Sequence, residues 1–216
     1  MLEIKCFECN ALQENCYVVS DETGECVVID CGAYYREEKD ALASYFRSHR
    51  LKPVHLLATH GHFDHNFGNE FLYADYQLQV EVCDEDAPLI KNMAKQTRQF
   101  MGVELVSRQQ PPIARLFQQG DTITFGTHTL KVLLTPGHTH GSCLFYCEQE
   151  HVVFSGDTLF RMSIGRTDFA EGSWDEMMYS LQHVVAALPP QTVVYAGHGP
   201  QTTIADELQY NPYLRF

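Results

Sequence analysis

The chain has 216 residues, of which 44% are hydrophobic and 20% are charged. This balance supplies enough apolar surface for a buried core and does not fit a disordered or low-complexity chain. Lysine and arginine total 15 against 28 aspartates and glutamates, so the formal net charge is −13. An acidic surface repels polyanions, which argues against nucleic-acid binding and against docking on an anionic membrane.

No apolar run approaches the roughly 18 residues that a transmembrane helix needs. The first residues include Glu3, Lys5 and Glu8, where a signal peptide would be apolar. We therefore expect a cytoplasmic protein in which residues 1–216 form a single domain. The sequence carries no indication of an oligomeric state.

The eight cysteines are too few for a disulfide scaffold. Cys6 and Cys9 form a CxxC pair, but no second pair or matching histidine pair accompanies them. Most of the other cysteines lie in or beside apolar runs, where a free thiol packs as a small hydrophobe. These are Cys16, Cys26, Cys31 and Cys143.

The first half of the chain alternates strand and helix patterns. Short runs rich in β-branched residues predict strands, of which the first two form a hairpin around Thr23-Gly24. Apolar residues at helical spacing predict a helix, which Pro53 ends, and a second helix is predicted with Asp84 as its N-cap. The strands cover 16–20, 26–30 and 54–59, and the helices cover 37–50 and 84–96.

The second half repeats this arrangement. Ser173 and Glu176 form a capping box before a helical apolar pattern, and a last helix begins near Thr203. The predicted strands cover 122–125, 130–134, 142–147, 151–154 and 193–196. Two successive blocks of strands and helices favour two sheets packed face to face with helices outside, but the pattern by itself does not fix that layering.

The densest chemical signal is the stretch Thr59–His65, of sequence THGHFDH, directly after a predicted buried strand. In a loop, His60 and His62 can aim at one ion, while Asp64 and His65 at the start of the next helix can aim at a neighbouring ion. Asp64 can also cap that helix, because aspartate is a preferred N-cap residue. Capping and metal binding through different oxygens are compatible.

Three more potential ligands occur where a predicted strand gives way to a turn. His138, Asp157 and His198 each follow a glycine, which lets the backbone approach closely. A lone histidine in such a place is more often structural. Because three such positions occur in one chain together with the cluster of residues 60–65, metal binding is favoured over a structural role. Five histidines and two aspartates supply ligands for two borderline cations such as zinc.

The ordered set of these seven residues resembles the metallo-β-lactamase superfamily. Four further strings resemble its glyoxalase II branch, the hydroxyacylglutathione hydrolases: PGHTHGS at 136–142, SGDTLF at 155–160, GRTDF at 165–169 and GHGP at 197–200. The resemblance spans from about residue 16 to the C-terminus. It implies an α/β fold, an αββα sandwich of two packed mixed sheets with helices on the outer faces.

The resemblance also implies a division of the ligands between two divalent metal ions, zinc first, with iron or manganese as alternatives. The first ion would take His60, His62 and His138, the second Asp64, His65 and His198, and Asp157 would bridge both. The fuller glyoxalase II enzymes add a C-terminal helical domain that supplies much of the glutathione pocket. This chain looks like the short form, so glutathione recognition is not carried over.

The predicted activity is hydrolysis of a small-molecule thioester or ester, similar to S-lactoylglutathione, by a metal-bridging hydroxide. Two divalent ions lower the pKa of a shared water toward about 7. Asp64 is the predicted catalytic residue that orients this hydroxide. Arg166 is predicted to contact an anionic substrate, with a salt bridge to Asp168 as an equally weighted alternative.

Other functions stay open. An iron-dependent persulfide dioxygenase would use His60, His138 and Asp157, although such enzymes usually carry an acidic residue where this chain has Gly199. A β-lactamase is disfavoured for a cytosolic chain, and a nuclease by the net charge. A non-catalytic binding module on the same fold predicts missing ligands, and none is missing.

Overall fold

The computed structural model describes residues 1–215. Its first sheet has six strands in the order β1-β2-β3-β4-β5-β6, antiparallel as far as β3 and parallel from there on. The strands are β1 (Glu3–Cys9), β2 (Glu14–Ser20), β3 (Glu25–Ile29), β4 (Lys52–Leu57), β5 (Val80–Cys83) and β6 (Arg115–Phe117). The helices of this half are α1 (Arg36–His49), α2 (Asn69–Tyr76), α3 (Ala87–Lys91) and α4 (Met93–Met101).

The second sheet also has six strands, in the order β14-β13-β10-β9-β8-β7, with β10 and β13 parallel and the other pairs antiparallel. Its strands are β7 (Thr122–Phe125), β8 (His128–Leu134), β9 (Cys143–Cys147), β10 (Val152–Gly156), β13 (Val193–Ala196) and β14 (Thr202–Thr203). A small hairpin pairs β11 (Leu159–Phe160) with β12 (Ser163–Ile164). The helices are α5 (Trp174–Ser180), which continues as a π-turn over Leu181–Val185, and α6 (Ile204–Tyr210).

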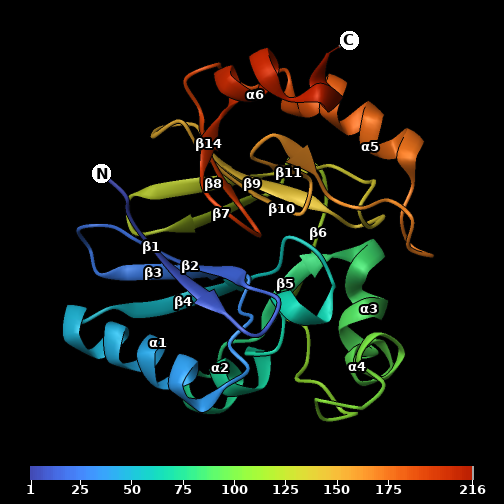
Figure 1. Ribbon diagram of the computed structural model, residues 1–216. Coiled ribbons are helices and arrows are strands. Elements are labelled where there is room, and N and C mark those ends of the chain that lie inside the picture. Colours follow the sequence, from blue (N-terminus) through green and yellow to red (C-terminus); the bar gives the residue numbers. More distant parts are fainter. Residues whose placement is uncertain (216) are drawn as a thin grey trace.

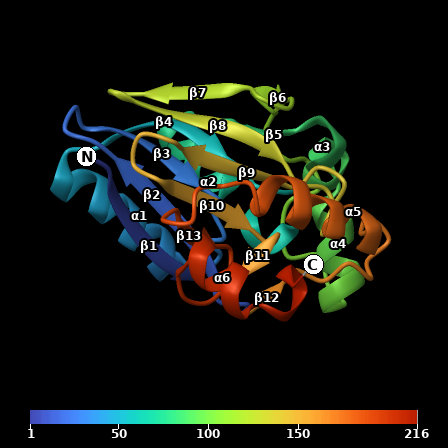
Figure 2. The same cartoon turned by 90° about the horizontal axis from the view of Figure 1, so that it is seen from above.

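The two sheets face each other, and the helices cover their outer faces (Figure 1). Helices α1 to α4 lie on the side of the first sheet, and α5 and α6 lie on the side of the second. Seen from above, the strands of both sheets are stacked within one body (Figure 2). The predicted αββα sandwich is confirmed. None of the helices within residues 1–215 has the length and apolar character needed to cross a membrane.

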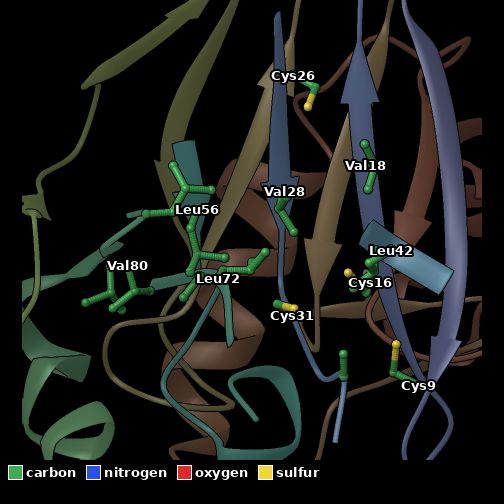
Figure 3. Close-up of a cluster of buried hydrophobic side chains, with 14 of the residues drawn as sticks. Cys9, Cys16, Val18, Cys26, Val28, Cys31, Leu42, Leu56, Leu72 and Val80 are labelled. Atoms are coloured by element: carbon green, nitrogen blue, oxygen red, sulfur yellow. The ribbon is translucent and has the colours of Figure 1, made fainter. Parts of the chain in front are cut away.

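Alternation along β2 and β3 divides the buried side chains between two cores. Tyr17 and Val27 pack between the sheets with Phe145 and Phe154. Their neighbours point the other way, toward Leu42 of α1 and other helix residues. Figure 3 shows this second group, in which the thiols of residues 9, 16, 26 and 31 lie among valine and leucine side chains. All eight cysteines are free, and those predicted to pack as hydrophobes are buried.

The sequence predictions need correction in three respects, of which the first concerns elements for which no range was predicted: helix α2 and strands β1, β5, β6, β11, β12 and β14. Strand β1 was not predicted, because its polar sequence EIKCFEC lacks apolar alternation; it forms by pairing with β2 over its whole length. The predicted helix over 84–96 is a 3₁₀ turn at 84–86 followed by α3 and α4, which meet at Asn92. Asp84 therefore caps no α-helix.

The third correction concerns the caps. Asp64 lies inside a 3₁₀ turn, Phe63–His65, whose N-cap is His62, so Asp64 does not cap a helix. Only half of the predicted capping box forms. Ser173 accepts a hydrogen bond from the backbone N–H of Glu176, whereas the Glu176 carboxylate contacts His140.

Candidate metal centre

The loop after β4 carries the histidine-rich stretch, and buried amide side chains fix its path. Asn66 donates from Nδ2 to the carbonyls of His60, at 3.1 Å, and His62, at 2.7 Å. Gln96 of α4 donates to the carbonyl of Gly61 at 3.0 Å. Asn66 and Gln96 thus fix the backbone of the loop on the side of the first sheet. The imidazoles of His60 and His62 lie on the other side, beside His138 of the second sheet.

The three other predicted ligands come from turns of the second sheet. His138 follows β8, Asp157 follows β10 and His198 follows β13. Since β10 and β13 are parallel neighbours, their carboxyl ends meet at one edge. A Cβ on Gly197 would lie only 2.4 Å from Oδ1 of Asp157, so the glycine lets the two turns close on each other.

One group of side chains consists of His60, His62 and His138. Each offers one ring nitrogen, and these nitrogens lie within 4.8 Å of one another. Nδ1 of His62 and Nε2 of His138 are 2.9 Å apart. Nε2 of His60 is buried without a hydrogen-bond partner among the described residues.

Electrostatics favours the neutral form of two members of this group, His60 and His138. Burial, with the neighbouring imidazoles, holds the pKa of His60 well below its usual value, and burial also lowers the pKa of His138. Neutral imidazole has a free lone pair and is the form that binds metal.

A second group consists of Asp64, His65 and His198, again with one atom each within 4.8 Å of the others. Nε2 of His65 lies 3.2 Å from Nε2 of His198, which in turn lies 3.5 Å from Oδ2 of Asp64. Burial alone would raise the pKa of Asp64, but the imidazoles of His65 and His198 hold it well below its usual value. The carboxylate is therefore ionised at neutral pH.

Asp157 lies between the two groups. Its Oδ2 is 3.5 Å from Nε2 of His138 and 3.7 Å from Nε2 of His198, and its Oδ1 is 3.4 Å from Nε2 of His65. Oδ1 is buried and has no hydrogen-bond partner within residues 1–215. One carboxylate thus contacts members of both groups.

The donor set fits two borderline divalent cations. Five imidazole nitrogens and two carboxylates converge without a thiolate, a combination suited to zinc, iron or manganese. Buried Nε2 of His60 and Oδ1 of Asp157, which have no hydrogen-bond partner among the described residues, fit a cation as their partner, because a buried polar atom without a partner is costly. Three nearby carboxylates, Asp157, Asp64 and Asp30, outweigh burial and raise the pKa of His65 to about 10, which also marks a site that favours cations.

Three acceptors orient the imidazoles from outside. Oδ2 of Asp30 accepts from Nδ1 of His65 at 3.0 Å, and Oε1 of Glu171 accepts from Nε2 of His62 at 3.0 Å. The backbone carbonyl of Arg166 accepts from Nδ1 of His138 at 2.8 Å. Such partners fix the ring orientation of a metal-binding histidine and raise its basicity.

Sequence reasoning missed these positioning groups. Asp30 was recognisable in principle, because it ends a predicted strand as several predicted ligands do. Nothing in the local sequence marks Glu171 or the carbonyl of Arg166.

The structure shows the Arg166 side chain in the alternative arrangement. Its guanidinium forms two hydrogen bonds to the carboxylate of Asp168, both at 2.9 Å, and lies 4.4 Å from the ring centroid of Phe169. Arg166 still lines the cavity beside the two groups of side chains.

This cavity has a volume of about 460 Å³, within the usual range for small-molecule sites. Its lining combines five of the seven predicted ligands with mostly apolar side chains. The lining residues are Leu12, His62, Phe63, Asp64, Phe100, Met101, His138, Asp157, Phe160, Ser163, Ile164, Arg166, Phe169 and His198.

The histidines that were not predicted as ligands lie outside these groups. His55 contacts Glu81, and His128 contacts both Asp21 and Glu150. His55 and Glu81 lie on the neighbouring interior strands β4 and β5, and His128 begins β8 beside the turns that carry Asp21 and Glu150. These contacts agree with the structural role expected from the sequence.

The sequence pattern of the metallo-beta-lactamase superfamily matches residues 9–198, and the chain belongs to this superfamily. Among its relatives is the hydroxyacylglutathione hydrolase GloC of Haemophilus influenzae, which is 30% identical over 215 residues covering 99% of this chain and 98% of GloC. This likeness supports a glyoxalase II-like member of the superfamily.

Solved structures with this fold that are more than 25% identical to this chain in sequence include BLEG-1, TTHA1623 and ETHE1. BLEG-1, a B3 metallo-beta-lactamase, has a TM-score of 0.91 and 31% identity, covering 99% of this chain and 100% of its own. TTHA1623 in a di-iron-bound form has a TM-score of 0.85 and 35% identity, and the match covers 97% of this chain and 100% of TTHA1623. ETHE1 from Myxococcus xanthus has a TM-score of 0.79 and 27% identity, and the match covers 97% of this chain and 83% of ETHE1.

Proposed function

We propose that this protein is a metal-dependent hydrolase of a small-molecule thioester or ester, similar to hydroxyacylglutathione hydrolases. The observation that carries the proposal is the convergence of two groups of nitrogen and oxygen donors, with Asp157 between them, on a cavity of about 460 Å³. The name of the relative GloC supports the thioester class.

The proposed ligand roles follow the two groups. His60, His62 and His138 would hold one divalent cation, zinc being the first choice. The second cation would take Asp64, His65 and His198, and Asp157 would be shared. When bound, two such cations supply Lewis acidity and lower the pKa of a water molecule from 15.7 toward about 7.

Residues of the chain itself would orient the attacking water. Asp64, ionised at neutral pH, can accept a hydrogen bond from the attacking water and direct its oxygen at the acyl carbon. The cavity is lined mostly by apolar side chains, so a substrate that displaces water from it would strengthen the electrostatic interactions around the reacting groups. A thiolate leaving group, with a pKa near 8.5, needs little help from a general acid.

Iron-dependent persulfide dioxygenase chemistry is the second candidate, because one similar structure is a di-iron form and another is ETHE1. It would use His60, His138 and Asp157 around one iron. Such a site leaves His62 without a ligand role, although Glu171 orients its ring as it would orient a ligand. This contact favours the two-cation hydrolase.

The test combines metal analysis with three assays on the protein as isolated and after loading with zinc or iron. We expect two cations per chain and steady-state hydrolysis of S-lactoylglutathione. A single iron with oxygen uptake on glutathione persulfide would overturn the hydrolase proposal. Turnover of a β-lactam in place of the thioester would assign the reaction named for BLEG-1 instead.

The shared role of Asp157 is tested by Asp157→Ala. We expect this variant to lose both cations together, because both groups depend on the same carboxylate. The measurement is metal content after gel filtration, with circular dichroism to verify the fold. A variant that keeps two cations per chain contradicts the shared role.

A further inference from the structure

Three phenyl rings form a continuous wall beside the first group of candidate ligands. The Phe169 ring centroid lies 5.3 Å from that of His62 and 5.8 Å from that of His138. Phe100 is 5.5 Å from Phe169 and 5.8 Å from Phe63, again between centroids. We call these three phenylalanines the aromatic wall.

The aromatic wall is incompletely covered in the free protein. Phe100 is 43% exposed and its neighbour Met101 is 46% exposed, although both line the cavity. They stand at the C-terminal end of α4. A group that buries this surface gains hydrophobic free energy in proportion to the area removed from water.

Apart from the candidate metal ligands, the same cavity offers little to a charged ligand. Among its lining residues, all within the described part of the chain, Arg166 is the only lysine or arginine. Its guanidinium is already bound through two hydrogen bonds by Asp168. The tripeptide of a glutathione thioester carries two carboxylates and an ammonium group, and burying such charges without partners is unfavourable.

We propose, on the basis of the hydrolase function above, that the substrate is a thioester carrying an uncharged apolar group that packs on the aromatic wall. A planar ring suits the edges and faces that the three phenylalanines present. Phe100 is then a specificity-determining residue. The reaction stays a hydrolysis: the water oxygen bonds to the acyl carbon, the carbon–sulfur bond breaks, and a carboxylate, a thiol and one proton are formed.

Three matched substrates test this. S-lactoylglutathione is the reference, S-mandeloylglutathione replaces its acyl methyl with phenyl, and the lactoyl thioester of benzyl mercaptan places the phenyl on an uncharged thiol. We expect kcat/KM to rise about tenfold or more for at least one phenyl thioester, the factor that burial of a ring supplies. The two phenyl arms show whether the ring belongs to the acyl or the thiol side.

A binding measurement without turnover accompanies the kinetics. S-benzylglutathione is expected to bind the metal-loaded protein at least fivefold more tightly than S-methylglutathione in calorimetry. Phe100→Ala should remove most of this preference and most of the kinetic preference, with metal content unchanged, because Phe100 is not a candidate ligand and its ring packs on Phe63 and Phe169. Tyr179→Ala, which removes an aromatic ring 61% exposed and outside the cavity, is the matched control and should keep both preferences.

The outcomes separate the two proposals. Hydrolysis of all three thioesters with no preference for phenyl, or a preference that survives Phe100→Ala, overturns the inference and leaves the hydrolase function intact. Failure of the zinc- or iron-loaded protein to hydrolyse any of the three overturns the hydrolase function, and the thioester substrate with it.

Discussion

Glu171 lies behind His62 and accepts a hydrogen bond from its Nε2 at 3.0 Å, while Nδ1 of the same ring faces His138. The hydrogen bond with His62 lowers the pKa of Glu171, so the carboxylate is ionised at neutral pH. A carboxylate in this place fixes the tautomer that leaves Nδ1 free for a cation and increases its basicity.

Glu171→Ala is therefore expected to weaken binding of one of the two cations by about 10- to 100-fold. Glu171→Gln, which keeps an acceptor oxygen, should lose less. Competition with a chromophoric chelator measures the affinity. Glu148→Gln, a change on an exposed turn, is the control, and equal affinity for Glu171→Ala and wild type would contradict the role of this carboxylate.

A second histidine–carboxylate contact predicts a pH dependence of stability. The hydrogen bond to buried Glu81 raises the pKa of His55 despite partial burial. Because the folded-state pKa lies above the unfolded value of about 6.5, the stabilisation is complete below pH 6.5 and is lost as pH rises through the folded-state pKa.

His55→Gln is thus expected to lower the free energy of unfolding by about 1 kcal/mol at pH 6 and by less at pH 9. Urea denaturation at both pH values measures the difference. Exposed His183→Gln should show no such change with pH. A His55→Gln effect that is equal or larger at pH 9 would refute the assignment.

The CxxC pair illustrates how an element changes the meaning of a residue pattern. Cys6 and Cys9 both lie in β1, where residues three apart point to opposite faces. Cys6 is exposed and donates from Sγ to Asn15, whereas Cys9 is buried. Two thiols on opposite faces of a strand cannot close on one ion or form a disulfide.

At the scale of elements, the 3₁₀ turn over Asp84–Asp86 joins the two loops of the first ligand group. The carboxylate of Asp86 accepts from the backbone N–H of Gly61 at 2.7 Å and of Gly141 at 2.9 Å, and from the Thr139 hydroxyl at 2.7 Å. Burial raises the pKa of Asp86, and these donors offset only part of that rise. The loop after β4 is thereby tied to the turn after β8.

Asp86→Asn places an amide among these donors and removes the charge that strengthens the hydrogen bonds. We expect a loss of about 2 kcal/mol in the free energy of unfolding. Denaturation by urea measures it, with exposed Asp84→Asn as the control two residues away. Equal losses for both variants would show that the Asp86 carboxylate does not brace the loops.

Elements with strong local patterns were predictable. The predicted bounds of β7 and β13 are those observed, because β-branched and apolar residues fill both strands between clear turn signals. β1 was missed, since it is an exposed edge strand whose partner strand determines it. The single helix predicted over 84–96 was wrong because residues 84–86 form a 3₁₀ turn and the backbone of Asn92 leaves the helical conformation between α3 and α4.

On the scale of the whole molecule, the candidate ligands come from both sheets. Residues 60–65 follow a strand of the first sheet, while His138, Asp157 and His198 follow strands of the second. A cation bound by both sets would join the two sheets and would stabilise only the folded state.

Removal of the cations by a chelator is therefore expected to lower Tm by about 5–10 °C. Differential scanning calorimetry of the metal-loaded and chelator-treated protein measures the shift. The Asp157→Ala variant, expected to hold neither cation, should have a Tm that does not respond to the chelator. An unchanged Tm for the wild type on complete metal removal would contradict a cation shared between the sheets.

Local patterns marked the longer strands, but the layering of the αββα sandwich was predicted only from the resemblance to the metallo-β-lactamase superfamily, since the packing of sheets depends on long-range contacts. The sequence alone selected seven candidate ligands, because each group of ligand types follows a predicted strand end. The tertiary structure alone determines their surroundings: the carboxylates behind His62 and His65, the pairing of Arg166 with Asp168, and the aromatic wall. Several of these contacts join residues far apart in sequence, 109 positions in the case of His62 and Glu171, and they exist only because loops of both sheets meet at one edge.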